Sequence, residues 1–99
     1  MDNRVKVVPE SVSDSTVTSL YRLMTDIPDD RLANHIDEQV VILEEANVNL
    51  EKAAAYYSGL LHDRDAFQRL GADYNHPSST DYMRLRLVAL YHMGLVSRR

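Results

Sequence analysis

The fold depends on residues 29–61, which read DDRLANHIDEQVVILEEANVNLEKAAAYYSGLL. Along this stretch one set of positions recurs at alternating spacings of four and three residues, which is the a/d pattern of a helical heptad repeat. The positions of this stripe are Ile36, Val40, Leu43, Asn47, Leu50, Ala54, Tyr57 and Leu61. The pattern predicts α-helix throughout the stretch, with a single asparagine in the middle of an otherwise apolar seam.

Two helical arrangements are compatible with this stripe. A single helix from about residue 29 to 62 would be roughly 50 Å long, whereas a chain of this size has an expected radius of gyration of only about 13 Å. Such a helix would leave part of its stripe uncovered, and another chain would have to cover it, with Asn47 fixing the register. Alternatively the helix breaks at Asn47-Val48-Asn49 and folds back as a hairpin, because asparagine is a poor interior helix residue and a good N-cap.

We expect the unbroken helix, and therefore self-association through the stripe. The predicted oligomer interface consists of Ile36, Val40, Leu43, Asn47, Leu50, Ala54 and Tyr57.

Shorter elements are expected on the N-terminal side. Residues 3–8 alternate weakly up to Pro9 and predict a short strand or an extended arm. A first helix begins after Ser13 or Asp14, since either side chain can accept a hydrogen bond from the first turn. One face of this helix carries an apolar stripe formed by Val17, Leu20, Tyr21 and Met24.

The C-terminal third contains several helix-end signals. Gly71 is placed to end a short helix in the left-handed conformation. Ser78 and Asp81 are spaced as a capping box that would open the last helix. Gly94 is expected to end that helix, and residues 95–99 are expected to be extended. The predicted fold is therefore all-α, with about four helices, a long second helix and short strands at the two termini.

Composition limits the class of protein. The 99 residues are enough for one domain, within which residues 10–61 form a helical oligomerisation part and residues 62–99 a second part. There is no cysteine, so disulfides and thiolate metal sites are excluded. No apolar run approaches the roughly 20 residues that span a bilayer, and we expect no membrane partner. We find no phosphate loop, nucleophile elbow or metal-ligand spacing, and we expect a cytoplasmic or virion protein that is not an enzyme and carries no metal or cofactor.

Charge is distributed unevenly along the chain. Residues 1–61 contain 5 basic and 11 acidic side chains, whereas residues 62–99 contain 6 basic and 4 acidic ones, although the chain as a whole has a net charge of −4. A polyanion would be repelled by the first part and tolerated by the second.

Residues 65–99 carry a resemblance to a known family. A short helix ends at Leu70-Gly71, a loop follows, and a helix opened by serine and threonine ends in LYHMGLVSRR. This order resembles the second half of a winged helix-turn-helix domain, in which the recognition helix leads into the first strand of the wing. The chain ends where the second wing strand would begin, and we hypothesise that residues 3–8 replace it by pairing with residues 94–98.

The resemblance implies double-stranded DNA as the partner. Hydroxyl groups at the helix N-terminus would contact phosphates, and arginines on its early, outward turns would reach phosphates or base edges. Two terminal arginines would add non-specific attraction to phosphate. The residues implied are Ser79, Thr80, Arg84, Arg86, Arg98 and Arg99.

These observations favour a non-enzymatic, dimeric DNA-binding transcriptional regulator. One alternative rests on a second resemblance. Leu20-Tyr21-Arg22-Leu23, followed by a long helix with Val48-Asn49-Leu50 and Ala53-Ala54-Ala55, is similar in helix order to the small head-to-tail adaptor proteins of tailed phages. The other alternative is a small helical inhibitor or regulator that covers a protein partner.

Overall fold

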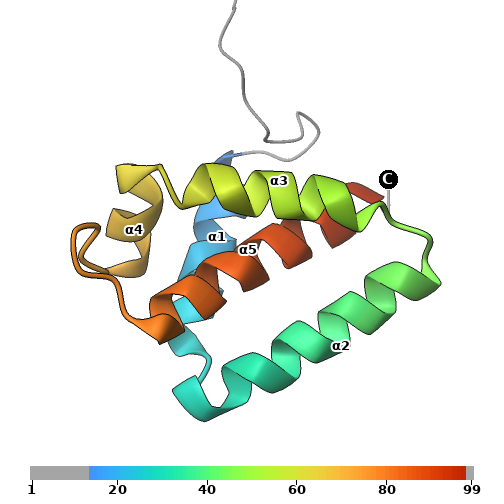
Figure 1. The fold of residues 1–99 in the computed structure, drawn as a ribbon, viewed down its shortest axis with the longest axis horizontal. Helices are drawn as coiled ribbons and strands as arrows, with labels where there is room; N and C mark the ends of the chain where they lie inside the picture. Colours follow the sequence, from blue (N-terminus) through green and yellow to red (C-terminus); the bar gives the residue numbers. More distant parts are fainter. Residues whose placement is uncertain (1–13, 98–99) are drawn as a thin grey trace, which may run out of the picture.

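The computed structural model describes residues 14–97, and within this range it contains five α-helices, one short 3-10 helix and no strand (Figure 1). The elements are α1 (Asp14–Asp26), η1 (Asp29–Arg31), α2 (Leu32–Glu45), α3 (Leu50–Leu60), α4 (Arg64–Leu70) and α5 (Ser79–Ser97). The all-α prediction is thus confirmed for the described residues. The strand predicted over residues 3–8 lies outside them.

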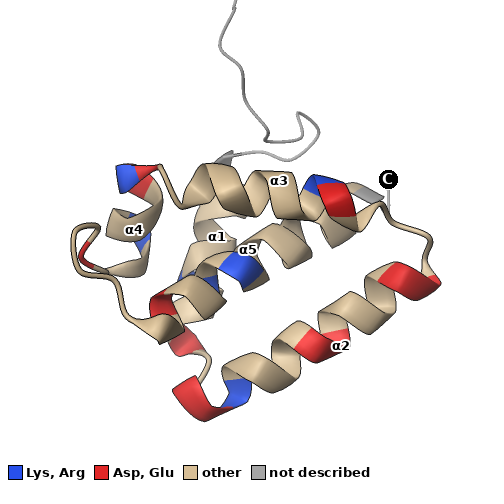
Figure 2. Cartoon of the chain, in the orientation of Figure 1, with Lys and Arg blue, Asp and Glu red and all other residues tan. Residues whose placement is uncertain are grey.

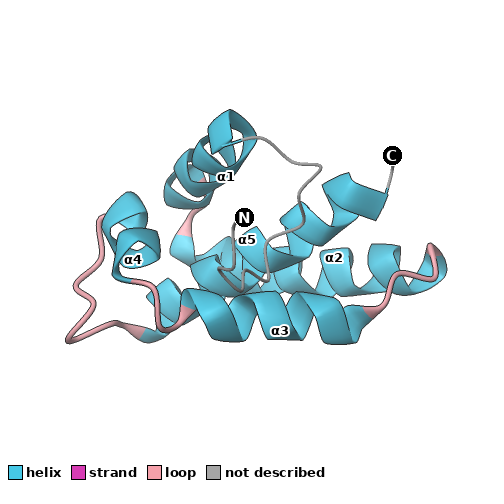
Figure 3. Ribbon diagram, turned by 90° about the horizontal axis from the view of Figure 1, so that it is seen from above, coloured by secondary structure: helices cyan, strands magenta, loops and turns pink. Residues whose placement is uncertain are grey.

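Helix α5 is the centre of the fold. It packs against α1, α2 and α3, and more lightly against α4 (Figures 1 and 3). Buried residues occupy most sides of its middle turns and leave only the side of Arg86 exposed, a pattern typical of a central helix. The buried residues in these turns are Leu85, Leu87, Val88, Ala89, Leu90, His92 and Met93.

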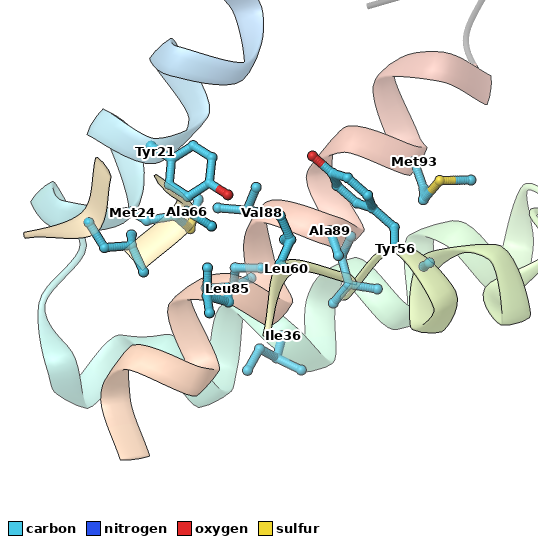
Figure 4. Close-up of a cluster of buried hydrophobic side chains, with 14 of the residues drawn as sticks. Tyr21, Met24, Ile36, Tyr56, Leu60, Ala66, Leu85, Val88, Ala89 and Met93 are labelled. Atoms are coloured by element: carbon cyan, nitrogen blue, oxygen red, sulfur yellow. The ribbon is translucent and has the colours of Figure 1, made fainter. Parts of the chain in front are cut away.

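One hydrophobic core joins all five helices (Figure 4). The apolar stripe predicted on the first helix is buried in α1, as expected from its spacing. Residues on both sides of position 61 contribute to the same core, so the two predicted parts of the chain fold together. Representative members are Tyr21 and Met24 of α1, Ile36 of α2, Tyr56 and Leu60 of α3, and Ala66 of α4.

The prediction of one unbroken helix over residues 29–62 is wrong, because the chain reverses direction after α2. Asn47 adopts the left-handed conformation, with φ of 59°. The N–H of Asn47 donates to the carbonyl of Glu44 at 3.1 Å, and the N–H of Val48 donates to the carbonyl of Leu43 at 2.9 Å. This pair of bonds is a Schellman motif, which satisfies carbonyls at the end of the helix.

The next helix starts immediately after the reversal. The side chain of Asn49 accepts a hydrogen bond from the N–H of Glu51 at 2.9 Å and so acts as the N-cap of α3. The two asparagines therefore have separate roles: Asn47 ends α2 and Asn49 begins α3. The hairpin also fits the size of the described part of the chain, whose longest dimension is 36 Å.

Two other predicted helix ends are confirmed. Gly71 follows α4 with φ of 73°, in the left-handed region where glycine meets no steric penalty. At the start of α5, the N–H of Ser78 donates to the carboxylate of Asp81 at 2.8 Å, and the N–H of Asp81 donates to the Ser78 hydroxyl at 3.2 Å. These reciprocal bonds form the predicted capping box.

The predicted end of the last helix at Gly94 is wrong. Helix α5 continues to Ser97, so residues 95–97 are helical and the expected strand after Gly94 is not formed there. Gly94 lies where α5 passes α2, and a Cβ at this position would stand 3.4 Å from Cδ2 of Leu43. Burial of the last turns of α5 outweighs the weak helix propensity of one glycine, which is only about 1 kcal/mol relative to alanine.

Candidate interaction groove

The stripe predicted as an oligomer interface divides into two parts in the structure. Ile36 and Leu43 are buried in the core, where α2 packs along α5. This part of the stripe is covered within the chain and needs no second molecule. The remaining predicted positions are half-buried (Val40, Leu50, Tyr57) or exposed (Asn47, Ala54).

Most of these uncovered positions line an apolar groove. Helices α2 and α3 diverge from the hairpin, and α5 runs between them (Figure 1). The groove has a volume of about 260 Å³. Its lining comes from all three helices: Val40 of α2; Leu50, Ala53, Ala54 and Tyr57 of α3; and Arg86, Ala89 and Leu90 of α5.

Arg86 is the one charged residue of this lining. Its side chain is exposed and forms no ion pair with any other residue in the described part of the chain. Burial raises the pKa of Tyr57 above its ordinary value, although the positive charge of Arg86 nearby acts in the opposite direction. The phenol is therefore neutral at physiological pH. The groove thus offers an apolar surface, a phenolic hydroxyl and a free guanidinium.

The outward face of α2 has the opposite character. Val41 and Ile42 are large apolar residues that are 52% and 42% exposed. Together with Asp37 and Glu38 they surround a shallow depression of about 540 Å³. We call these four residues the acidic ridge. Helix α2 contains no lysine or arginine, and acidic residues recur along it as far as its C-terminal end (Figure 2).

Arg84 does not face outward as predicted. Its Nε donates to the carbonyl of Met24 at 3.1 Å, and its guanidinium forms an ion pair with Asp29. Asp81 lies 4.0 Å away on the same helix, and the Arg84 side chain is only 16% exposed. The expected outward orientation is wrong because α5 is the core helix and Arg84 lies on its side toward α1.

The other residues predicted to bind nucleic acid are distributed over the start of α5, the groove and the C-terminal end of the chain. Ser79 and Thr80 are in the first turn of α5, where the Thr80 hydroxyl is hydrogen-bonded to that of Ser78 at 2.8 Å. Arg86 lines the groove. Arg98 and Arg99 lie outside the described residues. The described members of the set therefore do not form a single basic surface.

Two features were missed by the sequence interpretation. The exposure of Val41 and Ile42 follows from the heptad register, which places them opposite Ile36 and Leu43, but they were not singled out. His92 is fully buried against Tyr56, with ring centroids 4.8 Å apart and edge-to-face. Neither ring nitrogen of His92 has a hydrogen-bond partner among the described residues.

The position of His92 differs from that of His35. His92 lies in the core and lines neither the groove nor the depression on α2. His35 is more accessible and its Nδ1 lies 3.0 Å from the Tyr91 hydroxyl. Within residues 14–97 no three histidine or carboxylate side chains are grouped so that they could hold a metal ion.

Comparisons with protein-family models, with curated proteins and with solved structures found no match to this chain. In the part of the chain that the structure describes, every helix is too short or too polar to cross a membrane.

Proposed function

We propose that this chain is a non-enzymatic protein-binding module, and that the groove between α2 and α3 receives a helix of its partner. One observation carries the proposal. The predicted helical stripe is covered by α5 at Ile36 and Leu43 but left open at Leu50, Ala54 and Tyr57. Apolar surface that a fold leaves concave and open is characteristic of a binding site.

The spacing of the lining favours a helix over other ligands. Leu50, Ala54 and Tyr57 follow one another at intervals of four and three residues along α3, with Val40 opposite them on α2. A partner helix with apolar residues at the same intervals can lie along such a stripe, as in other helix-in-groove complexes. Ala54 is small and exposed, which leaves room for a larger side chain of the partner. Arg86 favours a carboxylate on that helix.

DNA binding through α5 is less well supported by the geometry. A recognition helix must present one long face to the major groove, whereas the middle turns of α5 are buried and Arg84 is bonded to α1 and η1. The net charge of −4 also opposes a polyanion. The DNA-binding regulator and the phage adaptor both stay predictions.

Selection from a displayed library of helical peptides tests the proposal. We expect selected peptides to carry apolar residues at intervals of three and four together with an acidic residue. Ala54→Arg should abolish their binding by filling the groove. Ala55→Arg is the matched control, because Ala55 is exposed on the same helix but does not line the groove.

The outcomes separate the candidate functions. Failure to select any helical peptide, or equal loss of binding in both arginine variants, would contradict the groove proposal. A fluorescence anisotropy titration of labelled duplex DNA at low salt, run on the same preparations, tests the alternative. Salt-dependent binding that Ala54→Arg leaves unchanged would favour the DNA-binding regulator.

A further inference from the structure

We infer that the groove's occupant is the acidic ridge of a second copy of this chain, so that copies associate head to tail. The inference rests on the proposed function, because it names the helix that the groove receives. Two surfaces of one subunit carry it: the ridge on the outward face of α2, and the groove between α2 and α3.

The ridge has the properties required of a helix that enters the groove. Val41 and Ile42 are adjacent, large and apolar, and both are exposed on a regular helix. They are flanked by Asp37 and Glu38, which line the same depression. An exposed apolar pair between carboxylates matches a concave apolar surface that contains one unpaired cation.

Charge complementarity selects a second copy as the occupant. The ridge contains two carboxylates, and α2 as a whole contains no lysine or arginine that would repel Arg86. In the groove, Arg86 has no ion-pair partner among the described residues. Contact between the two surfaces would therefore place Arg86 of one copy close to the carboxylates of the other. This attraction would fix the register and orientation of the ridge in the groove.

The same charges disfavour symmetric pairing. Two ridges placed face to face would bring Asp37 and Glu38 of one copy against those of the other, and like charges in contact are unfavourable. Two grooves placed face to face would oppose Arg86 to itself and leave both concave surfaces unfilled. Ridge against groove avoids both conflicts. Because the ridge lies on the outward face of α2 and the groove lies on the side toward α3 and α5, one contact leaves the second ridge and the second groove of the pair free. The contact is then heterologous and generates a closed ring or an open chain instead of a twofold dimer.

Mixing two variants of the full chain tests this inference. Ile42→Arg damages the ridge and keeps the groove, whereas Ala54→Arg damages the groove and keeps the ridge. Both positions are exposed, so both variants should fold, which circular dichroism and thermal unfolding will verify. The readout is solution mass by light scattering and sedimentation velocity, from micromolar to near-millimolar concentration.

We expect the unaltered chain to increase in mass with concentration beyond that of a dimer. Each variant alone should stay monomeric, because all of its copies lack either an intact ridge or an intact groove. An equimolar mixture of the two should form a dimer and nothing larger, since only one pairing joins an intact groove to an intact ridge. Ala55→Arg should assemble like the unaltered chain.

A second pair of changes tests the charge contribution. Arg86→Glu should weaken assembly by at least about tenfold in the dissociation constant, because it opposes a carboxylate to the ridge. Adding Asp37→Lys and Glu38→Lys to the same chain should restore assembly.

Three results would overturn the inference. These are a chain that is monomeric at every concentration, a mixture of variants that forms no dimer, and a twofold dimer that ends the assembly. If the chain is monomeric but selected peptides bind in a manner that Ala54→Arg abolishes, the self-association fails and the proposed function stands. If neither self-association nor peptide binding occurs, both fail.

Discussion

The guanidinium of Arg84 in α5 is hydrogen-bonded to the carbonyl of Met24 in the last turn of α1, with 3.1 Å between Nε and the oxygen. Helix-terminal carbonyls have no partner inside their own helix, and a cation near them also interacts favourably with the helix dipole. The same guanidinium pairs with Asp29 of η1. Arg84 therefore links α5 to both the end of α1 and η1, and so stabilises the position of the turn between α1 and α2.

Replacement of Arg84 should destabilise the fold. We expect Arg84→Met to lower the free energy of unfolding by about 1–3 kcal/mol, because it removes a charge-assisted bond and leaves a partly buried carbonyl unpaired. Arg86→Met is the matched control, since Arg86 is exposed and unpaired in the described structure, and it should change stability by less than about 0.5 kcal/mol. Urea unfolding followed by circular dichroism measures both. Equal effects of the two substitutions would mean that the Arg84 bonds contribute nothing specific.

The left-handed conformation of Asn47 gives a prediction about the hairpin. Glycine adopts a positive φ without steric cost, whereas a Cβ costs about 1–2 kcal/mol there unless a short polar side chain compensates. We therefore expect Asn47→Gly to leave stability unchanged or slightly raised, and Asn47→Ala to lower it by about 1 kcal/mol. Thermal unfolding of the two variants provides the comparison. An Asn47→Ala variant that is more stable than the parent would indicate that residues 32–60 prefer one continuous helix.

Local signals in the sequence correctly predicted the helix ends at Gly71 and Ser78. The capping box of Ser78 and Asp81 and the left-handed Gly71 depend on residues within a few positions of each other, so the chemistry that makes them is visible in the sequence. The residues that form the break at Asn47 are also close together in the sequence. Whether the helix breaks there or continues is not determined by neighbouring residues alone. The outcome depends on whether another element of the same chain can cover Ile36 and Leu43.

The centre of the fold could not be deduced in the same way. Apart from Arg86, the side chains of residues 85–93 are buried or half-buried, but the sequence interpretation placed Arg84 on an outward turn of this helix. Gly94 was interpreted as a helix end because the sequence does not show that it packs against Leu43, which lies about fifty positions earlier in the chain. The groove is harder still, since its lining comes from three helices whose divergence is a property of the packed fold.

Burial of His92 predicts a loss of stability in mild acid. Burial lowers the pKa of His92 in the folded chain below its ordinary value, while the unfolded chain retains a pKa of about 6.5. The unfolded state therefore binds the proton more readily. The contribution of neutral His92 to the free energy of unfolding is therefore fully present above the pKa of the unfolded chain. It is lost as the pH falls from that value through the lower pKa of the folded chain, with a slope of at most about 1.4 kcal/mol per pH unit.

The pH dependence can be assigned by substitution. We expect the free energy of unfolding of the parent to fall between neutral pH and pH values below the unfolded pKa, and His92→Phe to reduce the slope over that window. His76→Gln is the control, because His76 is exposed and should leave the slope unchanged. Denaturant unfolding at a series of pH values measures the slopes. The prediction is wrong if His92→Phe and the parent lose stability in parallel.

The close passage of α5 over α2 at Gly94 gives the last prediction, which depends on the size of the side chain introduced. A Cβ would stand 3.4 Å from Cδ2 of Leu43, an ordinary contact with the end of a flexible side chain. Gly94→Ala should therefore gain helix propensity and raise the free energy of unfolding by up to about 1 kcal/mol. Gly94→Leu must displace Leu43 from the core and should lower it by about 1–3 kcal/mol. Denaturant unfolding of the two variants separates the steric effect of the side chain from its helix propensity. A leucine variant as stable as the alanine variant would mean that α5 and α2 are not closely packed at this point.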